Sequence, residues 1–254
     1  MNSYLIASVA FLCIFGGAMS GFFFQRFLPS HHLSKDSHDS VKLGAGLIAT
    51  MAALILGLLV SSSKGTYDRV NLLINDAAAN TISLDKTLRN FGPEAAPIRK
   101  LLLDRVIMIR NEVWPEDNKG LHKGSAALRQ ESNILSLIKD IASLHASDLG
   151  STQMKNNALS IASDLNKERW QITVESSSKL PFPLVVIPVF WITFLTFVYG
   201  LFAPRNGTVL AVLFFCSLSI SGAIYLICEM SMPLDGSIKV PSQPIQTALE
   251  LISR

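Results

Sequence analysis

"KLGAGLIATMAALILGLLVSSSKGTYDRV" occupies Lys42 to Val70 and passes from an apolar run into a polar one without a proline. Its apolar part, Val41 to Val60, is long enough to cross a bilayer, which takes roughly 20 mainly apolar residues of helix. From there to Phe91, apolar residues recur every three or four positions, which is typical of an amphipathic helix. We therefore expect one helix that crosses the membrane and continues into water for a total of about 75 Å.

The composition also favours a membrane protein. Of the 254 residues, 49% are hydrophobic and only 16% are charged, whereas soluble domains are roughly a quarter charged. Most charges of both signs lie between Lys64 and Lys179, so this middle segment is the part expected in water. The net charge of +3 is too small to predict a nucleic-acid partner. Cys13, Cys216 and Cys228 all lie in apolar runs and are interpreted as small packed side chains.

Four apolar runs qualify as spans: Leu5 to Phe24, Val41 to Val60, about Leu184 to Phe202, and about Val209 to Met230. The last two are joined by the short polar turn "APRNGT" and are expected to form a helical hairpin. The first run was weighed against a cleaved signal peptide, because "GAMSG" offers small residues. No positive charge precedes it and the apolar run continues through "FFFQRF", so we expect a retained span.

An even number of spans places both termini and the middle segment on one side of the membrane. Slightly more Lys and Arg residues lie near the span ends on that side, which predicts that it is the cytoplasm. The predicted fold is an all-α membrane protein in which a cytoplasmic helical bundle is inserted between spans 2 and 3, with span 2 continuing into the bundle. Its parts are spans 1 and 2 (1–62), the cytoplasmic bundle (63–180), the hairpin of spans 3 and 4 (181–232) and a C-terminal tail (233–254).

Within the middle segment, "FGPEAAP" is expected to end the long helix at Gly92. A second bundle helix carries apolar residues from Ile98 to Val113, and a third is expected from about Ser125 to His145. A fourth begins near Ser151 and leads into span 3. The outer faces mix both charge signs, which is typical of a solvated surface rather than a binding patch.

The second span is rich in small residues, which allow helices to approach closely in lipid. Gly46, Ala49 and Ala53 are candidates for such helix packing. A second interpretation is that the small side chains leave room for a narrow pore. The two interpretations are compatible if packing and pore lining use opposite faces of the same helix.

The sequence contains no catalytic motif, so we do not expect an enzyme or a cofactor. His31, His32 and His38 lie with acidic residues in "PSHHLSKDSHDS" and could bind a metal weakly. Metal sites need ligands held in a fixed geometry, so a flexible polar loop without a metal is the favoured interpretation.

The stretch from Val41 to Pro115 resembles the bestrophin-like membrane proteins of bacteria in "VKLGAGLIATMAALILGLLVSSSKGTYD", "AANTISLDKTLRNFGPEAAPIRKLLLDRV" and "WPED". The resemblance implies four spans, a cytoplasmic helical middle, a place in the bacterial inner membrane and a distant relation to bestrophins. Bestrophins are pentameric anion channels whose second span lines the pore with bulky side chains. Here that helix has no Phe between Val41 and Val60, and its larger candidates are Met51, Leu54 and Leu58.

Two hypotheses follow. In the first, the chain forms an oligomeric, bestrophin-like and pentameric channel for small anions, with spans in lipid and copies of itself as partners. The pore would be lined by Thr50, Leu54, Gly57, Ser61 and Lys64, with Leu54 as an apolar constriction. In the second, the chain is a non-conducting scaffold or sensor whose bundle binds a cytoplasmic partner. The oligomeric state in detergent discriminates between the two.

Overall fold

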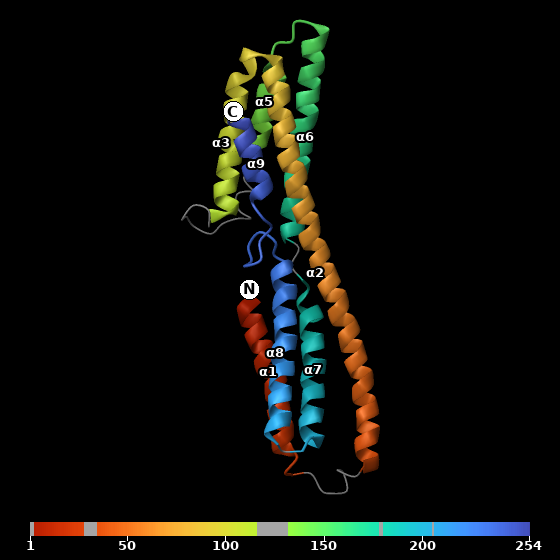
Figure 1. Cartoon of the computed structure of the whole chain (residues 1–254). Helices are drawn as coiled ribbons and strands as arrows, with labels where there is room; N and C mark the ends of the chain where they lie inside the picture. The colour runs from red at the N-terminus through yellow and green to blue at the C-terminus, as the bar shows by residue number, and fades with distance from the viewer. Residues whose placement is uncertain (1–2, 28–34, 116–131, 178–179, 205) are drawn as a thin grey trace. The chain divides into compact units, whose positions relative to one another are not determined.

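The computed structural model describes residues 3–27, 35–115, 132–177, 180–204 and 206–254, and all regular structure in these ranges is helical (Figure 1). The elements are α1 (Ser3–Phe24), α2 (Lys35–Phe91), the short η2 (Pro93–Ala95), α3 (Ala96–Val113), α5 (Ser132–Ser143), α6 (Leu149–Ser177), α7 (Phe182–Phe202), α8 (Gly207–Met230) and α9 (Gln243–Ile252). The chain divides into two compact units. We call them the membrane unit, Met1–Gly65 with Lys179–Ser231, and the bundle unit, Thr66–Ser178 with Met232–Arg254.

Helix α2 is a single helix of 57 residues, which confirms the continuity predicted from the sequence. The serine-rich patch around Ser62 and the glycine at Gly65 do not interrupt it. It ends where Gly92 adopts a φ of 122°, a backbone conformation that residues with a side chain rarely adopt. Pro93 follows and starts the next helical turn, as the sequence predicts.

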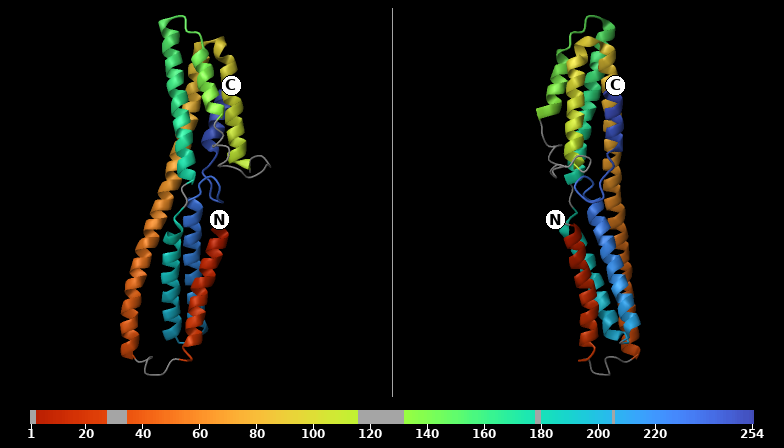
Figure 2. Two further views of the ribbon diagram at one scale, coloured as in Figure 1. Left: turned by 180° about the vertical axis from the view of Figure 1, so that it is seen from behind. Right: turned by 60° about the vertical axis from the view of Figure 1, so that its left-hand side comes forward.

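Four helices among the described residues are long and apolar enough to cross a membrane, and they contain the predicted spans. Within the membrane unit, α1 and α7 lie side by side and run in the same direction (Figure 2). Thr196 Oγ1 donates a hydrogen bond to the Ile14 carbonyl at 2.8 Å, and further along both helices Gln25 Nε2 donates to the Ala203 carbonyl at 3.2 Å. First and third spans of a chain that crosses back and forth must be parallel in this way.

The bundle unit has one apolar core, to which α2, α3, α5, α6 and α9 all contribute. Its fully or almost fully buried members include Val70, Leu84, Leu88, Ala95, Ile141, Ala158, Ala162, Leu234, Val240 and Ala248. Trp114 fixes the segment before α9, because its indole Nε1 donates a hydrogen bond to the Val240 carbonyl at 2.7 Å.

The segment 233–254 was predicted only as a tail, and it contains helix α9. Ile245, Ala248 and Ile252 are spaced three and four residues apart and are buried in the bundle core. Helix α9 contacts α3 (Figure 2), which precedes it by more than a hundred residues in the sequence. The amphipathic pattern is present in the sequence, but it covers only three turns and gives little signal without its partner.

Candidate functional site: the exposed face of helix α2

Within the membrane unit, α2 buries one narrow face. Ala45, Ala52, Leu59 and Ser63 are almost fully buried and are spaced seven or four residues apart, so they lie along one side of the helix. Ala52 packs with apolar side chains of α1, α7 and α8, and Ala45 packs with Leu195 and Val198 of α7. At the end of this face, Ser231 Oγ donates a hydrogen bond to Ser63 Oγ at 3.0 Å. This face is therefore occupied by the chain's own helices.

The predicted pore-lining residues lie on the opposite side of α2. An α-helix turns by about 100° per residue, which places Thr50 about half a turn from Ala52 and Leu59. Thr50, Leu54, Gly57, Ser61 and Lys64 are all exposed in the single chain. We call these five residues the open face of α2. Leu54, the large apolar side chain among them, is 74% exposed.

Three residues of the open face, Thr50, Gly57 and Ser61, have small side chains. A Cβ atom added at Gly57 would meet no atom within 4 Å. The Thr50 hydroxyl folds back on its own helix, with the Gly46 carbonyl at 2.8 Å and the Leu47 carbonyl at 2.9 Å. Neighbouring helices of the same chain therefore leave this face uncovered, and a second surface can approach its backbone closely.

The residues predicted to pack α2 against other helices are not the ones that are most deeply buried in the single chain. Gly46 and Ala53 are exposed, and Ala49 is half-buried beside Leu195 and Val198. Ala45 and Ala52, one position before Gly46 and Ala53, are almost fully buried and belong to the apolar clusters inside the chain. Close helix packing by Gly46, Ala49 and Ala53 stays a prediction.

The closest helix approach in the membrane unit was missed in the sequence. Gly17 and Gly21 form a G-x-x-x-G motif, the spacing that brings two transmembrane helices into backbone contact. A Cβ at Gly17 would lie 2.7 Å from the Thr193 carbonyl oxygen of α7, and one at Gly21 would overlap the Phe197 carbonyl oxygen. The motif is "GAMSG" itself, whose small residues were interpreted only as a possible cleavage site.

Outside the spans, one buried carboxylate connects α2 to α6. Asn80 Nδ2 donates a hydrogen bond to Glu168 Oε1 at 2.6 Å, and the carboxylate is buried. Burial raises the pKa of Glu168, the Asn80 hydrogen bond opposes the rise, and the nearby Asp76 and Asp164 add to it. Folding favours the protonated form of a carboxyl group whose pKa it raises. The ionised Glu168 therefore lowers the free energy of unfolding, and this loss becomes smaller as the pH is lowered.

The histidine-rich stretch 31–38, with the weak metal site considered at His31, His32 and His38, lies outside the residues whose side chains the structure describes. Among the described residues, no three His, Cys, Asp or Glu side chains come together as a metal site would require.

Comparison with known proteins gives a consistent assignment. A model of the Bestrophin-like domain family matches residues 12–245. The structure resembles a crystal structure of a mutant bacterial bestrophin homologue from Klebsiella pneumoniae, with a TM-score of 0.68, 15% sequence identity, and coverage of 96% of this chain and 97% of the other. A second mutant of that homologue gives a TM-score of 0.64 at 15% identity over 99% and 98% of the two chains. At these identities the likeness concerns the fold. No match was found among curated proteins.

Proposed function

This chain belongs to the bestrophin-like family, and from that premise we propose that it forms an oligomeric ion channel whose pore is lined by the open face of α2. The observation that supports the proposal most directly is the division of α2 into two faces. One face is buried by the chain's own helices, and the opposite face is uncovered, with small side chains at Thr50, Gly57 and Ser61. Copies arranged around an axis with α2 innermost would bring these open faces together.

The proposal includes an orientation and a state of assembly. The bundle lies in the cytoplasm, the spans lie in the bacterial inner membrane, and the assembly is a pentamer, as in bestrophins. The parallel direction of α1 and α7 supports a chain that crosses back and forth, with 63–180 and the N-terminus on one side. Native mass spectrometry of the purified protein tests the assembly. A monomer would reject the channel and favour a membrane-anchored scaffold.

Anion preference is assigned to Lys64, which is exposed on α2 and is the last residue of the open face along the helix. Rings of like charge at a pore mouth attract the counter-ion and repel the co-ion. We expect Lys64→Glu to lower the chloride-to-cation permeability ratio roughly tenfold. The measurement is the reversal potential in planar bilayers with asymmetric potassium chloride.

The control for charge alone is Lys100→Glu, which makes the same change at an exposed lysine of α3. Its reversal potential should match that of the unmodified protein. Absence of conductance in the unmodified protein, or a reversal potential that follows the cation, would refute the anion channel.

Leu54 is assigned as the constriction, because a ring of apolar side chains can close a pore by expelling water. We expect Leu54→Ser to raise the single-channel conductance or the open probability by roughly twofold or more. The smaller, polar serine side chains would widen the constriction and make it easier for water to enter. Leu58→Ser is the matched control. Leu58 is 69% exposed, compared with 74% for Leu54, but it lies about a quarter of a turn from the centre of the open face. Equal conductance changes in the two variants would remove Leu54 from the constriction.

A further inference from the structure

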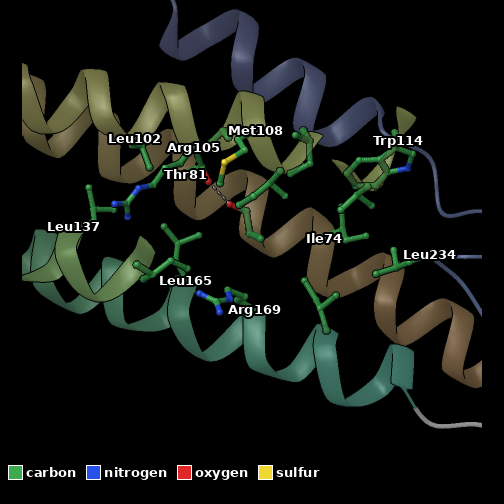
Figure 3. A pocket seen from close by; sticks show the side chains of 17 residues that line it. Ile74, Thr81, Leu102, Arg105, Met108, Trp114, Leu137, Leu165, Arg169 and Leu234 are labelled. Atoms are coloured by element: carbon green, nitrogen blue, oxygen red, sulfur yellow. Dashed lines mark hydrogen bonds between the residues drawn. The ribbon is translucent and has the colours of Figure 1, made fainter. Parts of the chain in front are cut away.

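Two pockets of the structure differ in the molecules that lie next to them. The bundle unit has a partly open pocket of about 120 Å³, lined mainly by apolar side chains, with Arg105 of α3 and Arg169 of α6 among them (Figure 3). A wider groove of about 410 Å³ lies in the membrane unit. Because the helices of this unit are surrounded by lipid, a membrane phospholipid is the molecule available to occupy the groove.

The groove lies between the end of α1 and the start of α8, which pack against each other in opposite directions (Figure 2). Phe15 of α1 contacts Phe214 of α8 edge to face, with the two ring centres 5.5 Å apart. One helical turn nearer this end of the unit, Met19 and Leu210 line the groove. The other lining residues are Phe22, Phe23, Arg26, Asn206 and Gly207. The groove therefore has apolar walls and a polar outer end.

The polar end of the groove is at the level of the lipid headgroups. Span 1 was predicted to end at Phe24 and span 4 to begin at about Val209, so Arg26 and Asn206 lie two and three residues beyond them. At about 1.5 Å per helical residue, this corresponds to roughly 3 to 5 Å. The headgroup layer is roughly 5 to 7 Å deep on each side of the hydrocarbon core. The apolar walls of the groove therefore lie in the hydrocarbon.

Arg26 is held at the mouth of the groove by the turn that follows α1. Its amide N–H donates a hydrogen bond to the Phe23 carbonyl at 3.2 Å. The neighbouring Gln25 side chain binds the Ala203 carbonyl at the end of α7, which fixes this turn to the other helices. The Arg26 side chain is exposed and forms no ion pair within the described part of the chain. No Asp or Glu is among the described residues that line the groove.

The start of α8 adds to the positive charge of Arg26. The Asn206 side-chain oxygen accepts a hydrogen bond from the Val209 amide at 2.9 Å and so caps the helix. The amides of Gly207 and Thr208 belong to the first helical turn, whose N–H groups have no partner within the helix. Such N–H groups and the helix dipole favour an anion at this position. An anionic headgroup in the groove would therefore be attracted by both Arg26 and the helix terminus.

We propose that the groove binds an anionic phospholipid. The lipid phosphate accepts hydrogen bonds from the Arg26 guanidinium, and one acyl chain lies against Met19, Phe23 and Leu210. Arginine donors match phosphate in geometry, and hydrogen bonds between ionised partners are stronger than neutral ones. The groove is open, so only part of the lipid has to fit into its volume. A zwitterionic lipid with the same chains also carries a cationic group, which Arg26 repels.

The test is native mass spectrometry of the purified full-length protein in detergent, with phosphatidylglycerol or phosphatidylcholine of identical acyl chains. We expect phosphatidylglycerol to bind roughly fivefold more tightly, because one basic residue near the membrane surface attracts an anionic lipid by about this factor. Inorganic phosphate at millimolar concentration should not displace the lipid, since it makes no contact with the apolar walls. Equal binding of the two lipids, or displacement by phosphate, would overturn the proposal. Absence of any bound lipid would also overturn it, and is the result expected if another copy of the chain covers the groove.

Two variants locate the binding. Arg26→Gln should remove the preference for phosphatidylglycerol, whereas Lys42→Gln should retain it. Lys42 is also exposed and lies near the start of α2, at the same end of the membrane unit (Figure 1), but it does not line the groove. Both side chains are exposed, so neither substitution is expected to disturb folding. A preference that survives Arg26→Gln would place the lipid elsewhere and refute the assignment. Because lipid binding is measured, the outcome is separate from that of the channel experiments.

Discussion

Replacing Gly21 by Ala should destabilise the membrane unit by about 2 to 3 kcal/mol, because the added methyl group has no space. A Cβ at Gly21 overlaps the Phe197 carbonyl oxygen and lies 2.9 Å from the Leu201 amide nitrogen. Both atoms belong to the backbone of α7, which cannot move aside as a flexible side chain could. The two helices must separate, and the hydrogen bond from Thr196 Oγ1 to the Ile14 carbonyl at the same crossing is then weakened.

The measurement is the thermal midpoint of the protein in detergent, followed by size-exclusion chromatography. Gly16→Ala is the matched control, because it lies on the same helix and a Cβ there meets no atom within 4 Å. Its midpoint should stay within about a degree of the unmodified protein, since an exposed helical Gly→Ala change adds no clash. Equal midpoints for the Gly21 and Gly16 variants would show that α1 and α7 do not pack through this motif.

The partner of Gly21 explains why the sequence did not reveal this contact. On α7, Gly200 is as crowded as Gly21, because a Cβ there would overlap the Ala18 carbonyl oxygen. The two glycines are far apart in the sequence, and only the fold brings them together. A G-x-x-x-G motif predicts a close helix contact but does not identify the other helix.

Helix α2 shows both the strength and the limit of pattern analysis. Its length and continuity follow from apolar periodicity and the absence of breakers, and the structure confirms both. Which face packs inside the chain does not follow, because Ala45 and Gly46, or Ala52 and Ala53, are adjacent and similarly small. In lipid, hydrophobicity does not distinguish a packed face from an exposed one, so sequence alone left both interpretations open.

The buried position of Arg169 in the bundle unit was not predicted, for a different reason. Arg105 and Arg169 resemble the many other charges of the middle segment, whose outer faces mix both signs. Arg169 becomes buried only when the bundle unit is folded. The sequence did contain a signal, because a charged residue lies on the apolar face of a predicted helix. Such residues are rarely buried without a partner, so this position could have been singled out.

An Asp85→Ala substitution is expected to cost the bundle unit about 3 kcal/mol, because it removes one member of a buried ion pair and leaves the other. Asp85 is only 3% exposed and accepts hydrogen bonds from Arg99 Nε at 2.7 Å and Arg99 Nη2 at 3.2 Å. Arg89 Nη2 approaches the same carboxylate at 3.3 Å. The Asp85 carboxylate therefore connects the end of α2 to the beginning of α3. The expected cost is at the lower end of the range for breaking a buried ion pair, because the Arg99 side chain keeps 26% of its surface exposed.

The matched control is Glu175→Ala, which breaks the pair between Arg69 and Glu175. That pair is 3.1 Å long, but its side chains are 59% and 30% exposed, so the expected loss is about 1 kcal/mol or less. Denaturant midpoints of the full-length protein compare the two variants, and amide hydrogen exchange shows where the structure opens. Faster exchange should appear at the beginning of α3 in the Asp85 variant only. If both variants lose the same stability, the Asp85 carboxylate does not connect α2 to α3 as its geometry indicates.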